Sequence, residues 1–223
     1  MKKALILAVV LGAAAFAQQA GGRGGGGGRG AAPQPIPLFF KEGWKDFSGN
    51  VPVTQEFVTN PDLKLNQYGS GKEDFGITNE GNVPHIWTGL CAGGCALTLS
   101  SKENFADLTG KARIRWYLKT SGFHEVRPVL KLADGTWLIG DHADAFVYDY
   151  HVSEFYLAEV HWLKLDMPKV LTKGTLLDKV DLSKVDEIGF ADLTPGSGHG
   201  LGGFSDVGWI EVYGKPVKRD AAK

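Results

Sequence analysis

The sequence predicts an all-β domain made of two packed antiparallel sheets. Short runs of β-branched and aromatic residues alternate with clusters of Gly, Pro, Asn and Asp, which is the pattern of strands joined by turns. No long stretch repeats apolar residues with the 3.6-residue period of a helix. Residues 38–219, about 180 in number, form a chain long enough to bury the core of a single sandwich.

The first 17 residues have the three parts of a secretion signal. Lys2 and Lys3 form a positive start, residues 4–15 are apolar, and Ala15-Phe16-Ala17 is a small-residue cleavage site. The apolar run is shorter than the roughly 20 residues that cross a bilayer. We therefore expect a bacterial-type Sec signal peptide at 1–17, no membrane span, and a secreted or periplasmic protein.

Residues 18–37 are rich in Gly with interspersed Arg and Pro, and they offer almost nothing to bury. This composition predicts a disordered linker, and residues 220–223 form a short tail. The whole chain carries a net charge of −1, and four cations but no acid precede residue 38, so the remaining chain carries −5. A mildly acidic domain of this kind is not expected to bind nucleic acid.

The strands are justified by their alternation. In 113–119 the apolar Ile114, Trp116 and Leu118 alternate with polar side chains, which predicts a strand with one core face and one polar face. The run 126–132 alternates in the same way, and we expect it to pair with the preceding strand across the turn at 120–125. Further strands are predicted at 95–99, 136–139, 146–150, 160–165, 187–190 and 207–213.

Cys91 and Cys95 are the only cysteines. In an oxidising compartment an isolated close pair is expected to form a disulfide, here closing a tight loop. The spacing lacks the CxxC pattern and the second ligand pair that redox or zinc sites use.

Four segments occur in a familiar order: Asp107-Leu-Thr-Gly-Lys before the alternating strand, Val160-His-Trp-Leu-Lys-Leu, the run 181–190 (DLSKVDEIGF) and the closing run 204–213 (FSDVGWIEVY). Together they resemble the galactose-binding-domain-like jelly rolls, a superfamily that includes many carbohydrate-binding modules. The resemblance covers about residues 97–214. It implies a jelly-roll sandwich, but the fold is shared by sugar binders, adhesion modules and enzyme appendages.

The resemblance further implies that the strands at 113–119, 126–132 and 146–150 line a concave face whose outward side chains meet the ligand. Sugars are bound by flat aromatic rings and by side chains that hydrogen-bond hydroxyls. The expected ligand-binding residues are Arg115, Tyr117, Arg127, Trp137, Asp141, His142, Tyr148 and Tyr150. Exposed His199 and Trp209, near the Gly-rich stretch 195–203, are candidates for the rim of such a site.

No catalytic or metal-binding residues are assigned. The pattern Asp141-His-Ala-Asp144 is typical of an exposed turn, although hard cations also use such oxygens. Related jelly rolls hold a structural calcium ion, for which Glu42, Asp46 or Glu211 could supply an acid. No other cofactor is expected. The spacing of a laminarinase-like acid motif is absent, as is the Gly-x-Ser-x-Gly elbow of acyl hydrolases.

The sequence therefore predicts an exported, non-catalytic, lectin-like module that binds a polysaccharide. Two alternatives remain open. One is a glycoside hydrolase or lyase on a lectin-like sandwich, as in the laminarinase-like and keto-disaccharide hydrolase families, with Glu154 and Glu159 or Asp141 and Asp144 as paired carboxylates. The other is a surface adhesion or structural module that binds other cell-surface proteins through a sheet edge.

Overall fold

The computed structural model describes residues 34–47, 49, 51–89, 91, 93–194 and 203–219. From Pro35 onward these residues belong to one compact unit. The predicted signal peptide, most of the predicted linker, His199 and the tail lie outside the described residues. The described chain is all-β with two antiparallel sheets, which confirms the predicted fold class, and it adds two short 3₁₀ helices, η1 (Gln55–Phe57) and η2 (Leu157–Glu159).

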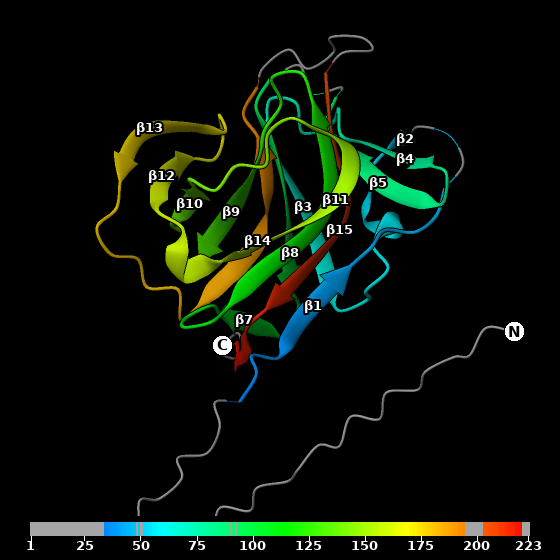
Figure 1. The fold of residues 1–223 in the computed structure, drawn as a ribbon. Helices are drawn as coiled ribbons and strands as arrows, with labels where there is room; N and C mark the ends of the chain where they lie inside the picture. The colour runs from blue at the N-terminus through cyan, green and yellow to red at the C-terminus, as the bar shows by residue number, and fades with distance from the viewer. Residues whose placement is uncertain are drawn as a thin grey trace, which may run out of the picture. The chain divides into compact units, whose positions relative to one another are not determined.

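The first sheet, here called sheet A, has seven strands among the described residues. Its order is β11 (Val147–Tyr156), β8 (Arg113–Ser121), β15 (Phe204–Tyr213), β5 (Val83–Trp87), β4 (Gly76–Glu80) and β2 (Val51–Pro52). The strand β1 (Leu38–Glu42) also pairs with β15, so that β15 contacts β8 along one edge and β5 followed by β1 along the other. Figure 1 shows β11, β8, β15 and β1 running side by side.

The second sheet, sheet B, has nine strands in the described part of the chain. Its order is β13 (Leu171–Leu176), β12 (Trp162–Asp166), β10 (Trp137–Gly140), β9 (Val126–Leu132), β14 (Val185–Asp192), β6 (Cys95–Ser101) and β3 (Leu63–Gly69). The short strands β7 (Asn104–Asp107) and β16 (Lys215–Lys218) pair with each other, and β7 joins the sheet through β14.

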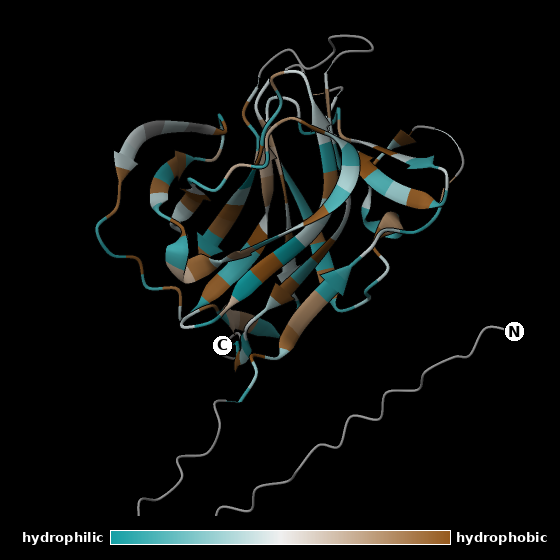
Figure 2. Ribbon diagram, viewed as in Figure 1, coloured by the Kyte–Doolittle hydropathy of each residue, from teal (hydrophilic) through white to brown (hydrophobic). Residues whose placement is uncertain are grey.

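The core lies between the two sheets and is built by alternation within each strand. On β8, Ile114, Trp116 and Leu118 are fully buried, whereas the polar residues between them are only partly covered. Figure 2 shows this pattern as alternating brown and teal bands along the strand. The predicted core face and polar face of this strand are thus confirmed, and its polar side chains lie on the outer face of sheet A.

The outer face of sheet B carries a second apolar cluster. On β9, Leu130 belongs to the main core, while its neighbour Val129 faces the other way and is equally buried. Met167 and Val170, from the turn between β12 and β13, pack in this cluster. Much of the outer face of sheet B is therefore covered, and the partly exposed aromatic and charged side chains of β8 and its neighbours lie on the other sheet.

A buried carboxylate stabilises the segment that follows the first strand of the sandwich. Glu42, at the end of β1, is fully buried and accepts backbone hydrogen bonds from Gly43, Trp44, Thr59 and Asn60 at 2.8–3.2 Å, and also the Thr59 hydroxyl at 2.7 Å. Trp44 has a left-handed backbone, with φ of 53°, which is unfavourable for a bulky residue. The bond from its N–H to Glu42 helps to stabilise this conformation.

One predicted pairing is wrong. The strand at 126–132 does not pair with the strand at 113–119; as β9 it crosses to sheet B and pairs with β10 and β14. Alternation alone could not distinguish the two arrangements, because both bury the same apolar residues, Val126 and Leu130, against one core. The consequence is that Arg127 and Trp137 lie on the opposite sheet from Tyr117 and Tyr150.

Candidate functional site

Three aromatic side chains from adjacent strands form a row on the outer face of sheet A. Tyr150 of β11 stacks on Tyr117 of β8, with ring centroids 4.9 Å apart and planes 20° apart. Tyr117 in turn stacks on Trp209 of β15 at 5.8 Å and 13°. The register pairs Tyr117 directly with Trp209, so both side chains point to the same face. We call Tyr150, Tyr117 and Trp209 the aromatic row; all three are half-buried.

Cationic side chains close both ends of the aromatic row. Lys119 lies 4.9 Å from the centre of the Tyr150 ring, and Lys41 lies 5.0 Å from the Trp209 ring. Within the row, Tyr117 lies between Tyr150 and Trp209, and these two rings cover its faces. The Lys41 side chain is 52% exposed and pairs with Glu211 at 2.9 Å, whereas the Lys119 side chain is only 12% exposed. The outer face of Trp209 is therefore covered by a surface side chain, and that of Tyr150 by a largely buried one.

Ion pairs line the row on the side of Trp209. Arg115 pairs with Glu211 at 2.9 Å and with Glu154 at 3.0 Å, and Lys41 pairs with Glu211 at 2.9 Å. Burial alone would raise the pKa of Glu211, but hydrogen bonds from Lys41 and Tyr213 outweigh it and hold the pKa below its usual value. Glu211 is therefore ionised at neutral pH, and the surface offers both hydrogen-bond donors and acceptors.

At the Tyr150 end, two buried polar atoms have no hydrogen-bond partner among the described residues: the Tyr150 hydroxyl oxygen and Asp206 Oδ1. Burial raises the pKa of Tyr150, and the nearby Asp206 charge adds to the effect. Burial also raises the pKa of Asp206, to about 6, against the lowering effect of His85 and Lys119. Polar atoms in such surroundings are normally paired, and these two lack that pairing among the described residues.

Two other predicted site residues, Trp137 and Arg127, lie on the outer face of sheet B. Trp137 of β10 packs edge-on against Tyr68 of β3 at 4.9 Å, with Lys131 5.5 Å from its ring. Arg127 donates two hydrogen bonds, at 2.9 and 2.7 Å, to the carbonyl oxygen of Gly140. The expected single face containing Arg127, Trp137, Tyr117 and Tyr150 is thus not formed, because β9 and β10 belong to sheet B.

The segment 141–144 contacts strands of both sheets and does not join the aromatic row. Asp141 pairs with exposed His161 at 2.8 Å. Asp144 accepts a bond from the buried indole of Trp116 at 2.7 Å, and a nitrogen of His142 lies 3.0 Å from the same carboxylate oxygen. The two acids therefore have protein partners.

Tyr148, also predicted to bind ligand, is 66% exposed at the start of β11, next to Phe204 at 6.1 Å. It lies on the same sheet as the aromatic row, but it contacts a different ring.

Most of the acids named for a calcium ion or for glycoside hydrolysis have partners of their own. Glu42 and Glu211 bind the groups described above, and Asp46 accepts a bond from Asn79 at 2.5 Å. Glu154 lies 3.5 Å from Arg113 as well as pairing with Arg115, while Glu159 lies in η2.

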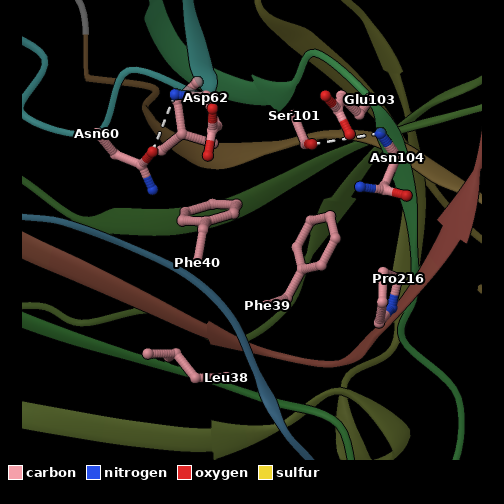
Figure 3. Close-up of a pocket in the computed structure, with 10 residues that line it drawn as sticks. Leu38, Phe39, Phe40, Asn60, Asp62, Ser101, Glu103, Asn104 and Pro216 are labelled. Atoms are coloured by element: carbon pink, nitrogen blue, oxygen red, sulfur yellow. Dashed lines mark hydrogen bonds between the residues drawn. The ribbon is translucent and has the colours of Figure 1, made fainter.

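A small pocket of about 220 Å³ lies elsewhere, where β1 approaches the β6–β7 turn (Figure 3). The rings of Phe39 and Phe40 point into it, and polar groups such as Asn60 and Ser101 surround it. It is smaller than the roughly 300–1,000 Å³ of ordinary ligand pockets, and it contains none of the predicted site residues.

The predicted disulfide is present: Cys91 and Cys95 are joined, with Cα atoms 6.3 Å apart, and both are buried. Trp209 is the site residue that sequence reasoning placed only at a rim. The period-two pattern of 209–213 already puts Trp209, Glu211 and Tyr213 on one face. What the sequence lacks is the register that sets Trp209 beside Tyr117.

Comparison with known proteins gives likeness at the level of the fold. No family model matches the sequence, and no curated protein matches it. No helix in the described part of the chain is long and apolar enough to cross a membrane.

Among solved structures, the chain is similar to the family 11 carbohydrate-binding module of the cellulosomal cellulase Lic26A-Cel5E of Clostridium thermocellum. The TM-score is 0.46 at 12% identity, over 82% of this chain and 97% of that one.

A structure of a family 11 module from the same organism, in complex with a β-1,3-1,4-mixed-linked tetrasaccharide, has a TM-score of 0.47 at 15% identity, over 76% and 98% of the two chains. An agarase, AgWH50C, has a TM-score of 0.43 at 9% identity; the match covers 76% of this chain and 25% of the agarase. At these scores and identities the comparisons carry no conclusion about what the chain binds.

Proposed function

We propose that this chain is an exported, non-catalytic module that binds a polysaccharide on the outer face of sheet A. The observation that carries the proposal is the aromatic row, which is half exposed and ends at the buried hydroxyl of Tyr150, an atom without a hydrogen-bond partner among the described residues. A ligand for this surface must offer both C–H groups for a ring face and hydroxyls for polar side chains. Sugars have both.

Each part of the row has a role in this proposal. The outer face of Trp209 receives the C–H face of a sugar ring once Lys41 has moved aside. Arg115 and Glu211 donate to and accept from hydroxyls at the rim. The Tyr150 hydroxyl pairs with a sugar hydroxyl that reaches the deeper end of the row. Because a single site of this kind is weak, several copies that bind one polysaccharide chain together would hold it more tightly than one copy does.

The test compares two tryptophans that differ in their sheet. Trp209 and Trp137 are both half-buried and each lies close to a lysine, at 5.0 and 5.5 Å, but they occupy opposite faces of the sandwich. We would measure retardation of the purified chain in native gels that contain a panel of soluble polysaccharides. Trp209→Ala should weaken binding by about 10-fold to 100-fold, as expected for a central aromatic contact, and Trp137→Ala should bind normally.

Two outcomes would contradict the proposal: no retardation by any glycan of the panel, or loss of binding in Trp137→Ala with binding kept in Trp209→Ala. Release of reducing ends from a retained glycan would replace the non-catalytic part of the proposal with the hydrolase alternative.

One observation favours adhesion to a protein as a second candidate. The strand β11 ends the order of sheet A, and exposed apolar residues at and just before its start include Phe146 at 63% and Tyr148 at 66% exposure. An exposed strand edge with apolar side chains can pair with another chain. This candidate predicts that binding to cells is lost after protease treatment of the cells and in Phe146→Ser with Tyr148→Ser. If the chain instead binds a glycan, binding survives the protease treatment and the double substitution, and it is lost in Trp209→Ala.

A further inference from the structure

Three side chains with metal-binding atoms meet beside the Tyr150 end of the aromatic row. They are Glu80 at the end of β4, His85 in β5 and Asp206 in β15, and one ligand atom from each lies within 4.8 Å of the other two. The side chains of His85 and Asp206 are only 4% and 7% exposed, whereas Glu80 is 59% exposed. The cluster thus has two fixed members inside and one mobile member at the surface.

The hydrogen bonding of His85 leaves one ring nitrogen available. Its Nδ1 lies 2.9 Å from the carbonyl oxygen of Val83, and since a carbonyl can only accept, Nδ1 carries the proton. In the neutral ring Nε2 therefore has a lone pair, and it lies 3.7 Å from Asp206 Oδ2. A lone pair facing a carboxylate is unfavourable unless a cation or a second ring proton lies between them. Histidines that bind metals usually have this arrangement, with the other ring nitrogen held by a carbonyl or a carboxylate.

Asp206 supplies an independent sign that a partner belongs here. Its Oδ2 lies 3.5 Å from Lys119 Nζ, but the buried Oδ1 has no hydrogen-bond partner among the described residues. Lys119 also pairs with Glu80. One ammonium group therefore serves two carboxylates, and a buried carboxylate oxygen is left unpaired, which is costly without a ligand.

We propose that Glu80, His85 and Asp206 bind a divalent transition-metal ion, with Zn²⁺ the best fit. One imidazole and two carboxylates are ligands that Zn²⁺ accepts, in a tetrahedral site completed by water. Ca²⁺ is a poorer fit because it needs six to eight oxygen ligands. In a tetrahedral zinc site, ligand atoms lie about 3.3 Å apart, so the cluster has to contract. Glu80 makes most of this movement because it is exposed, and Lys119 withdraws from between the carboxylates.

The test is titration calorimetry of the full chain, stripped with a chelator and titrated with zinc chloride alone, and in parallel with calcium chloride. One Zn²⁺ should bind per chain and more tightly than Ca²⁺. Glu80→Gln and His85→Gln should each weaken Zn²⁺ binding at least about 10-fold. Glu80→Gln keeps the proposal testable if His85→Gln does not fold, because Glu80 is exposed.

His161→Gln is the matched control, since His161 also pairs with an aspartate, at 2.8 Å, but lies just before β12 of sheet B and is 72% exposed. It should bind Zn²⁺ as the unmodified chain does. Lys119→Met removes the competing ammonium and should tighten binding several-fold. The proposal is overturned if no Zn²⁺ binds, if Ca²⁺ binds more tightly, if His161→Gln abolishes binding while His85→Gln keeps it, or if Lys119→Met weakens it. Because no glycan is present, these results are separate from those that test polysaccharide binding.

Discussion

Replacing Tyr150 with Phe should make the protein more stable and the ligand complex weaker. The Tyr150 hydroxyl is buried without a partner among the described residues, and a buried unsatisfied polar group costs about 1–3 kcal/mol. Tyr150→Phe removes that group and keeps the ring that stacks on Tyr117 at 4.9 Å. Taking the lower end of the range, we expect the free energy of unfolding to rise by about 1 kcal/mol.

Tyr68→Phe is the control with the opposite sign. The Tyr68 hydroxyl donates to the buried carboxylate of Glu187, with oxygen–oxygen distances of 2.9 and 3.1 Å. A hydrogen bond to a charged group contributes about 1.5–3 kcal/mol, so this variant should lose about that much stability. Urea unfolding followed by tryptophan fluorescence measures both variants under the same conditions.

The second half of this prediction concerns binding. If the Tyr150 hydroxyl pairs with a ligand hydroxyl, its removal costs the net value of a neutral hydrogen bond, about 0.5–1.5 kcal/mol, or about 2-fold to 12-fold in Kd. The reasoning is refuted if Tyr150→Phe is less stable than the unmodified chain, because the hydroxyl would then have a partner. Unchanged glycan affinity in Tyr150→Phe would refute its role in the site.

Three further predictions concern stability. Glu42→Ala removes the carboxylate that accepts the N–H of left-handed Trp44, and we expect the free energy of unfolding in urea to fall by about 3 kcal/mol. Glu73→Ala, at an exposed position, is the near-neutral control. A change within about 0.5 kcal/mol in Glu42→Ala would contradict the role given to Glu42. Burial raises the pKa of Asp144, but hydrogen bonds from His142 and Trp116 outweigh it and lower the pKa in the folded state. The stability that ionised Asp144 contributes is therefore present above the unfolded pKa of about 3.9 and is lost as pH falls through the folded pKa. Asp144→Asn should be less stable than the unmodified chain at about pH 7. In unfolding curves this difference in stability should close below about pH 4. Reduction of the Cys91–Cys95 disulfide should lower the free energy of unfolding by about 2 kcal/mol, the loop-entropy value for so short a loop, and a much larger loss would show that the bridge also holds the surrounding turn.

Local pattern was enough to predict the fold class and several strands. The alternation of Ile114, Trp116 and Leu118 fixes which face of β8 is buried, whatever the strand pairs with. The predicted strands at 95–99, 136–139, 146–150, 160–165, 187–190 and 207–213 overlap β6, β10, β11, β12, β14 and β15. The strands β3, β4 and β5 were not predicted; β3, LKLNQYG, and β4, GITNE, are mostly polar and half-buried, so they lack a clear apolar alternation.

The site could be predicted only in part, because pairing between sheets is a long-range property. Arg115, Tyr117 and Tyr150 share sheet A as expected, since β8 and β11 are neighbours. Arg127 and Trp137 were placed with them because β9 follows β8 directly in sequence, yet the chain crosses to sheet B between the two strands. The same limit hides the cluster of Glu80, His85 and Asp206, whose members lie on three strands and come together only through the pairing of β5 with β4 and β15.

Hydroxyl-radical footprinting of the unmodified chain, with and without a glycan that retards it, tests most directly which face binds. Sheet A and sheet B each present half-buried aromatic rings, so each can report protection in the same experiment. We expect the glycan to lower oxidation of Tyr117 and Trp209 and to leave oxidation of Tyr68 and Trp137 unchanged. Protection of Tyr68 and Trp137, with Tyr117 and Trp209 oxidised as in the free chain, would place the ligand on sheet B and contradict binding on sheet A.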